Sequence, residues 1–516
     1  MFLILTAAFS GASDIYIAQS AAGGSNGADC ADAFPVTFFN TASNWGTGGG
    51  QIGPGTTVHL CGTFSAPAGA SGYLTFQGSG ASGNPITLSF ESGAVLTAPY
   101  WGGNGAIQAG SLSNIVVDGG ANGIIQATAN GSPSGGYANQ QNGSAIYFTS
   151  VSASEVKNLN ISNMYVHTDP ADESGQNTFA IDWADGNSIS IDNNTIHDGG
   201  KWCIYAAYHA AGTTSNINIF NNTVYHCDHG VVIGDGDPGS TLQGANSVHG
   251  NVIYDPANWD DNANQNHHDG IHIWAVNGGG SVGNNVALYD NYIYGSWGTH
   301  MNSLIYIEGN WVNAGAYNNV LVVNSGCAGG AGLLAIAGQG MGGSNEYLYN
   351  NTVVGNSTQY CSLISVQGGV QNAVVKNNIS STGSAAFYST NDITVTLDHN
   401  VYYNWGGSGW TIGGKNYSTL ASYQSATGQD AHALAGNPNL GSTYVPQKGS
   451  PAVGLGGNMT SLGVSPLDFD KAGILRAASG VCVPGVPGCW DSGAYQFATG
   501  AATPPSPPTG LSAQVH

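Results

Sequence analysis

The sequence predicts an all-β fold, a single-stranded right-handed parallel β-helix in which short strands stack into a solenoid. Three observations predict it: a repeated unit of asparagine plus strand, a composition rich in glycine and poor in charge, and alternating apolar residues. The 516 residues include 80 Gly, and only 7% are charged. Such a chain favours short strands and tight turns over helices. Its 41% of hydrophobic residues can form a core, which argues against disorder.

The repeat is an asparagine followed by apolar residues, and it returns about every 22 to 40 residues, a spacing that suits one coil of a solenoid. The repeats start at Asn163, Asn194, Asn222, Asn251, Asn291, Asn351, Asn378 and Asn400. We expect each asparagine to adopt the left-handed backbone conformation at a corner and to hydrogen-bond to its equivalents in the neighbouring coils. A β-sandwich or a propeller explains the irregular spacing less well, because propeller blades keep a tighter period.

The ends of the chain differ from the repeats. Residues 1–13 resemble a signal peptide with a truncated start, or alternatively a buried strand, and they favour a secreted protein, extracellular or at the cell surface. We expect residues 14–110 to form an N-terminal cap and the first coils, and residues 111–410 to form the β-helix core. Residues 411–497 are expected to be an irregular region and cap, and residues 498–516 a Pro-rich linker or tail. No later run is long and apolar enough to span a bilayer.

The eight cysteines fall in sequential pairs, which in an exported protein predicts disulfides, with free buried thiols as the alternative. The expected pairs are Cys30 with Cys61, Cys203 with Cys227, Cys327 with Cys361, and Cys482 with Cys489.

The charge limits the partners. Seven Lys and Arg against 29 Asp and Glu give a formal net charge of -22, which argues against nucleic acid and against a strongly anionic polysaccharide. A neutral or weakly charged polysaccharide fits better. The exposed ends of the β-helix also allow self-association. We expect no cofactor, although structural calcium at the acidic residues Asp235, Asp237, Asp260 and Asp261 is an alternative.

One stretch departs from ordinary coil sequence, namely residues 226–230 and 267–274, which are rich in His and Asp. Aligning the coils on Ile271 and Ile273 predicts columns of stacked side chains. The predicted columns are His272 with Tyr147, Asp182, Tyr205, Val232 and Tyr306; His268 with Lys201, Asp228 and Asn302; Trp274 with Glu308; and Asp269 with His229 and Trp202. The first three columns are expected to point outward and to form a polar patch. Strict alternation would turn the fourth column inward, but it lies near a turn.

The patch suggests carbohydrate chemistry, because glycoside hydrolysis needs two carboxyl groups across the bond that breaks. Asp228 and Asp269 are the predicted pair, and His268 and His272 would tune a carboxyl pKa or act as a base. Aromatic and polar side chains nearby are expected to bind the substrate. These are Asp182, Lys201, Trp202, Tyr205, His229, Trp274, Trp297, Tyr306 and Glu308.

Other interpretations of the patch stay open. A lyase would need a base and a cation, which a His and Lys201 could supply. The imidazoles of His226, His229, His267, His268 and His272 would hold zinc or copper if they converge. Asp-Gly and His-Asp-Gly are also ordinary turn sequences. A non-catalytic surface or matrix protein, either a glycan-binding adhesin or a fibre subunit, has the same composition.

The coils between about 140 and 410 resemble the right-handed parallel β-helix repeat superfamily, and Asp491-Ser-Gly-Ala-Tyr resembles an ending common in its bacterial members. That superfamily includes pectate lyases, polygalacturonases and uncharacterised bacterial surface proteins. The resemblance implies a pectin-lyase-like fold and leaves the activity open, since the fold hosts lyases, hydrolases, adhesins and fibres. Family pectate lyases and polygalacturonases rely on Arg and Lys, whereas Arg476, the only arginine here, lies outside the coils.

Overall fold

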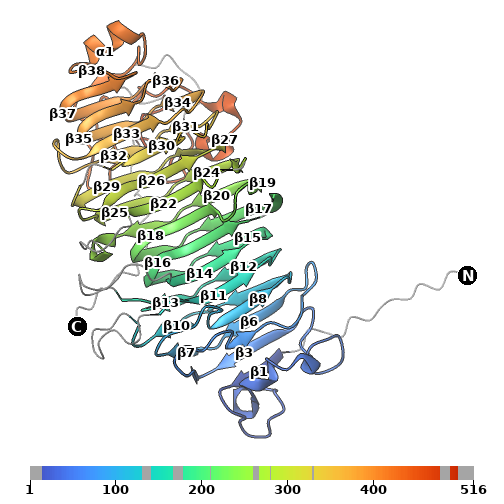
Figure 1. Ribbon diagram of the computed structural model, residues 1–516. Coiled ribbons are helices and arrows are strands. Elements are labelled where there is room, and N and C mark those ends of the chain that lie inside the picture. The colour runs from blue at the N-terminus through green and yellow to red at the C-terminus, as the bar shows by residue number, and fades with distance from the viewer. Residues whose placement is uncertain are drawn as a thin grey trace, which may run out of the picture.

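The computed structural model describes residues 14–130, 141–166, 178–209, 211–259, 267–278, 280–327, 330–476 and 489–497. The expected signal peptide and Pro-rich tail lie outside these ranges. Figure 1 shows one elongated stack of strands, from β1 (Asp14–Ala18) near the N-terminal end to β37 (Val401–Ile412) beside the helix α1 (Leu420–Thr427). Because each coil adds one layer to the stack, residues far apart in sequence become neighbours.

The strands belong to two long sheets that run the length of the stack, with 17 and 22 strands among the described residues. The larger sheet contains the segments that form the candidate site, in the order β11 (Gly143–Thr149), β14 (Thr178–Ala184), β16 (Thr195–Tyr208), β18 (Thr223–Asp235), β22 (His268–Ala275), β26 (Met301–Gly309) and β30 (Leu334–Ala337). These strands pair in parallel from one coil to the next. The predicted right-handed parallel β-helix is therefore confirmed.

Apolar side chains stack inside the coils in the predicted register. The column consists of Ile146, Ile181, Ile204, Val231, Ile271 and Ile305. Each of these side chains has no exposed surface. Alternation sends every second residue of a strand into the core, so the residues between them face the other side of the sheet. This register fixes the position of every residue in the candidate site.

A ladder of buried asparagines also joins the coils. Its members are Asn194, Asn222, Asn251, Asn291, Asn319, Asn351, Asn378 and Asn400. In each step, the side-chain amide and the backbone N–H of one asparagine donate to Oδ1 of the next. The predicted hydrogen bonds are confirmed.

Two details of the asparagine prediction are wrong. The left-handed conformation belongs to the residue before the ladder asparagine, as at Asn193 and Asn221, and not to the ladder residue itself. The ladder residue needs its side chain directed inward, so the turn is made one position earlier. Asn163 is not a member, because Leu159 stands where the preceding asparagine would be, and its backbone N–H donates to Asn194 Oδ1.

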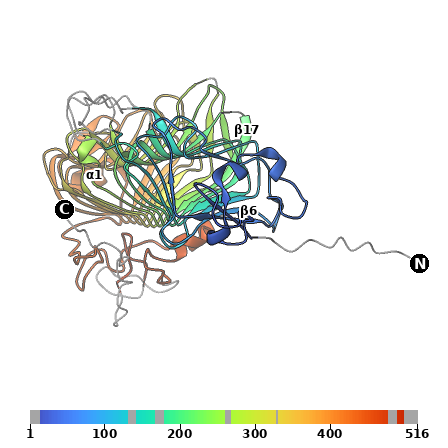
Figure 2. The ribbon, with the colours of Figure 1, turned by 90° about the horizontal axis from the view of Figure 1, so that it is seen from below.

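The C-terminal residues run back along one flank of the stack, as Figure 2 shows from the end. Asn377 contacts Gly457, Asn350 donates to the Asp491 carbonyl, and Asn318 donates to the Phe469 carbonyl. This segment therefore covers the corner of at least three coils. None of the helices in the described part of the chain has the length and hydropathy needed to cross a bilayer.

Three of the four predicted disulfides are present: Cys30–Cys61, Cys203–Cys227 and Cys327–Cys361. Cys482, the predicted partner of Cys489, lies outside the described residues.

Candidate active site

The candidate site lies on β18 and β22, where His229 pairs with Asp269. Trp202 on β16 precedes His229 in the same column, as predicted, and Ser303 on β26 follows Asp269. Gly270 allows this close packing, because a Cβ there would lie 2.5 Å from the Leu304 carbonyl oxygen. The stacked register therefore places residues of four coils in one column.

One predicted column is wrong. His268 lies opposite Met301 instead of Asn302, because the register shifts between His268 and Asp269. Asn302 is the extra residue of this irregularity, which turns its side chain toward the site. Its amide Nδ2 lies 3.3 Å from Asp269 Oδ1.

The four predicted catalytic residues converge but are enclosed instead of open to solvent. Asp228 and His268 have no exposed surface, Asp269 is 1% exposed and His272 is 4% exposed. The rings of Tyr306 and Trp274 pack on His272, with centroids 4.8 and 4.9 Å away. The predicted patch therefore has the expected strand register, but its four catalytic side chains are buried instead of exposed to solvent.

Asp228 lies between two imidazoles. His268 Nδ1 is 2.6 Å from Asp228 Oδ1, and His229 Nδ1 is 3.2 Å from Asp228 Oδ2. A carboxylate in this position orients both rings and fixes which nitrogen of each holds a proton. Asp228 therefore orients the His229 ring so that Nε2 points toward Asp269. The distance from His229 Nε2 to Asp269 Oδ2 is 3.4 Å.

Asp269 is the centre of the arrangement. Its Oδ1 accepts a hydrogen bond from the Ser303 backbone N–H at 2.9 Å. Its Oδ2 faces three imidazole nitrogens, His267 Nε2 at 3.0 Å, and His229 Nε2 and His272 Nδ1 at 3.4 Å each. We call His229, His267, Asp269 and His272 the His–Asp cluster. His267, named only among the metal alternatives from the sequence, is its most exposed member, with 46% of its side chain accessible.

Glu308 supports the cluster from the next coil. Its Oε2 lies 2.9 Å from His272 Nε2, while its Oε1 accepts from the Gln339 amide at 2.9 Å and from the Tyr306 hydroxyl at 3.2 Å. The pairing of Glu308 with Trp274 was predicted and is confirmed. Gln339 was missed, because it lies in a loop where the strand pattern ends.

The electrostatics keep both aspartates ionised. Burial alone would raise their pKa values, but the imidazoles around Asp228 and Asp269 hold both pKa values well below the usual range. Burial would lower the pKa of His229, but the two carboxylates raise it to about 9. A glycosidase of the two-carboxyl type needs one protonated carboxyl group, so this pair lacks the proton donor. The catalytic roles of Asp228 and Asp269 stay a prediction.

Asp182 has the opposite character, since burial raises its pKa to about 7. It lies in the column of His272, but three coils away through Tyr205 and Val232. At about 4.8 Å per coil, that is about 14 Å. Asp182 therefore lies at the end of the site and not at its centre.

Aromatic rings form a continuous surface beside the cluster. Trp202 lies 4.7 Å from Tyr205 and 5.5 Å from both Phe179 and Trp274 between ring centroids. We call these four residues the aromatic platform; each is partly exposed. Lys201 Nζ lies 4.9 Å from the Trp202 ring centroid. Trp297, expected to bind substrate, instead has no exposed surface and packs in the core, so it cannot stack on a sugar.

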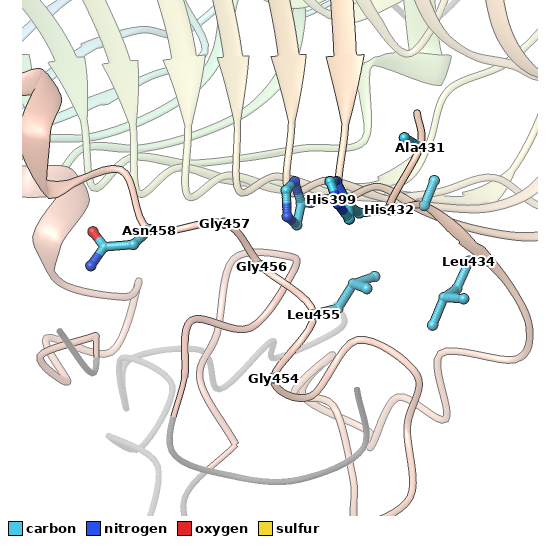
Figure 3. Close-up of a pocket in the computed structure, with 10 residues that line it drawn as sticks. His399, Ala431, His432, Leu434, Gly454, Leu455, Gly456, Gly457 and Asn458 are labelled. Carbon is cyan, nitrogen blue, oxygen red and sulfur yellow. The ribbon is translucent and has the colours of Figure 1, made fainter. Parts of the chain in front are cut away.

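A second group of His and Asp residues was missed by the sequence analysis. His432 Nδ1 lies 3.0 Å and His399 Nδ1 3.0 Å from Asp398 Oδ2, and the two rings stack 4.6 Å apart. Figure 3 shows His399 and His432 at the edge of a pocket of about 320 Å³ between the last coils and the returning C-terminal segment. The residues come from separate segments without a shared repeat pattern, which is why no motif showed them.

Only some of the acidic residues proposed as calcium ligands lie within the described residues. Asp235 accepts hydrogen bonds from the backbone N–H groups of Val276 and Asn277, at 3.2 and 2.8 Å. Its carboxylate therefore already has partners. Asp260 and Asp261 lie outside the described residues.

No protein-family model matches the sequence, and no curated protein matches it. The chain is similar in structure to XylC in complex with xylose (10% identity, 83% of this chain and 87% of that one, TM-score 0.42). It is also similar to pectate lyase Pel9A (14% identity, 95% and 97%, TM-score 0.34) and to an exopolygalacturonase from Thermotoga maritima (10% identity, 70% and 86%, TM-score 0.29). By its own strand pairing and register, the chain is a right-handed parallel β-helix protein.

Proposed function

We propose that this protein is secreted and hydrolyses a neutral or weakly charged polysaccharide on the flank of its β-helix. The observation on which the proposal rests is that the aromatic platform adjoins the His–Asp cluster. Trp274 belongs to the platform and contacts His272 of the cluster, with 4.9 Å between ring centroids. Aromatic faces bind sugar rings, and buried ionisable groups are typical of reaction centres.

The platform would hold the sugar chain. Phe179 and Trp202 lie on neighbouring coils, about 4.8 Å apart along the stack, and Trp274 lies two coils beyond Trp202, so a polysaccharide lying parallel to the solenoid axis meets several rings. Stacking of one sugar on Trp202 and Trp274 would position the next glycosidic bond beside Asp269 and His272. Fixing the bond next to reactive groups is itself a large part of catalysis.

Asp269 would supply the charge at the reaction centre. Its Oδ2 is buried and has no hydrogen-bond partner among the described residues, although three imidazoles surround it. Its negative charge would stabilise the positive charge that develops on the sugar ring as the glycosidic bond breaks. Water entering beside His267, the exposed member of the cluster, would add its hydroxyl group to the sugar and its proton to the leaving oxygen.

The charge and the disulfides support the choice of substrate and location. The formal net charge of -22 repels a strongly anionic polysaccharide, so a neutral glycan is the better substrate. Three disulfides in the described residues are typical of proteins from oxidising compartments.

The test is to incubate the purified protein with a panel of neutral plant and bacterial polysaccharides and to detect new reducing ends. We expect a product from wild type, no product from Asp269→Asn, and a higher KM for Trp202→Ala. The control is Asn313→Gly, which should retain wild-type turnover. Asn313 is exposed and belongs to the side of the stack formed by the other sheet. Binding that depends on Trp202 without any product would identify a glycan-binding protein and refute hydrolysis.

A further inference from the structure

We propose that His229, His267, Asp269 and His272 bind one divalent transition-metal ion, best matched by zinc. The inference concerns the site of the proposed function and names a cofactor for it. Metal binding is measured without any glycan, so the two proposals can fail separately.

The positions of the four donor atoms suit a small cation. His229 Nε2, His267 Nε2, Asp269 Oδ2 and His272 Nδ1 all lie within 4.8 Å of one another. Three of the separations, those from Asp269 Oδ2, are 3.0, 3.4 and 3.4 Å. Ligands bound to zinc at about 2.0–2.1 Å in a tetrahedron are about 3.3–3.4 Å apart. The distances from Asp269 Oδ2 therefore match a zinc site closely, and the imidazole nitrogens, within 4.8 Å of one another, would move closer together around an ion.

The groups behind the ligands are those that support metal sites. His229 and His272 each direct one nitrogen to the cluster and the other to a carboxylate, Asp228 at 3.2 Å and Glu308 at 2.9 Å. A carboxylate that holds the outer N–H of a histidine leaves the inner nitrogen with a lone pair for a metal. Asp269 is held in the same way, because the Ser303 N–H binds Oδ1 and leaves Oδ2 to face inward.

The contacts of two buried donor atoms are a second indication. Asp269 Oδ2 and His272 Nδ1 are buried and have no hydrogen-bond partner among the described residues. Their contacts within the cluster are ion pairs at 3.0–3.4 Å, whereas most buried polar atoms make a well-directed hydrogen bond. A cation bonded to both atoms would give each a directed partner.

The donor set selects the metal. Three imidazoles and one carboxylate suit zinc and its neighbours in the transition series, whereas calcium and magnesium require oxygen ligands. The other two histidines of this stretch are engaged elsewhere: His226 Nδ1 lies 3.5 Å from Asp198 Oδ1, and His268 Nδ1 binds Asp228. Four protein ligands fill a tetrahedron, so a zinc ion here would hold β18 and β22 together beside the aromatic platform.

The experiment is isothermal titration of the full-length, chelator-treated protein with Zn²⁺, and with Ca²⁺ as a second probe. We expect one saturable zinc site, no comparable calcium binding, and a loss of about 100-fold or more in zinc affinity for His229→Ala and His272→Ala. Asp228→Asn keeps all four ligands and should weaken zinc binding about 10- to 100-fold. His432→Ala removes an imidazole from the separate Asp398–His399–His432 group and should leave the zinc affinity unchanged.

Circular dichroism of each variant identifies any that fails to fold, and anomalous diffraction at the zinc edge tests the wild type directly. The expected peak lies about 2.1 Å from the four donor atoms. No saturable zinc binding, or binding that His432→Ala abolishes and His272→Ala does not, would overturn the inference. Zinc binding by a protein that is inactive on every glycan would overturn the proposed hydrolysis and leave the metal site standing.

Discussion

Replacing one asparagine of the ladder tests how the coils are joined. Asn291 has no exposed surface, and its Nδ2 donates to the Val248 carbonyl and to Asn319 Oδ1, both at 3.0 Å. Its Oδ1 accepts from the backbone N–H and the side-chain amide of Asn251, at 3.0 and 3.1 Å. Asn291→Ala removes these four hydrogen bonds and leaves buried groups unpaired. At about 1 kcal/mol for each, we expect the free energy of unfolding to fall by about 4 kcal/mol.

The assay is equilibrium unfolding in guanidinium chloride, followed by tryptophan fluorescence. The control is Asn313→Gly, because Asn313 is exposed, has a φ of 59° that glycine adopts freely, and makes one exposed side-chain bond to Asn285. The control should change stability by less than about 1 kcal/mol. The reasoning is refuted if Asn291→Ala destabilises the protein no more than Asn313→Gly does.

Three further predictions concern stability. Burial raises the pKa of Glu346 well above its ordinary 4.5, so the folded state retains a proton that the unfolded state loses, and stability falls as pH rises from about 4.5 toward the folded pKa. Glu346→Gln should therefore change the Tm little at pH 4 and raise it at pH 8, as measured by differential scanning fluorimetry. Arg476 is buried and donates to five acceptors. Arg476→Met should therefore lower the free energy of unfolding by about 3 kcal/mol and make the C-terminal segment more susceptible to limited proteolysis. A cleavage rate equal to that of the wild type would contradict this. Replacing both Cys203 and Cys227 by Ser should lower the unfolding free energy by about 3 kcal/mol in the same guanidinium assay, and a loss below 1 kcal/mol would contradict it.

The fold could be predicted from the sequence because its signals repeat. Each coil has its own alternating apolar residues, and most coils have their own asparagine. A strand that is hard to recognise in one coil can therefore be placed from the pattern of its neighbours. The aligned isoleucines showed which residues share a column, and Trp202, His229 and Asp269 indeed stack. The close cysteine pairs followed from the same stacking, which brings residues one coil apart together.

The sequence located the candidate site but did not predict its local strand register or the burial of its side chains. The irregularity at Asn302 changes the register by one residue, and nothing in the local sequence marks it. The enclosure of His272 depends on Tyr306 and Trp274 folding over it, which is a matter of side-chain packing that strand alternation does not specify. Trp297 was expected to bind substrate, yet the turn after the strand Tyr292–Ser296 directs it into the core.

The most direct test of the central claim is a crystal structure of the Asp269→Asn variant with an oligosaccharide of the glycan that the wild type cleaves. The account predicts a sugar ring stacked on Trp202 and Trp274, with a glycosidic oxygen within about 4 Å of residue 269 or His272. An oligosaccharide bound away from these residues, with the aromatic platform empty, would contradict it.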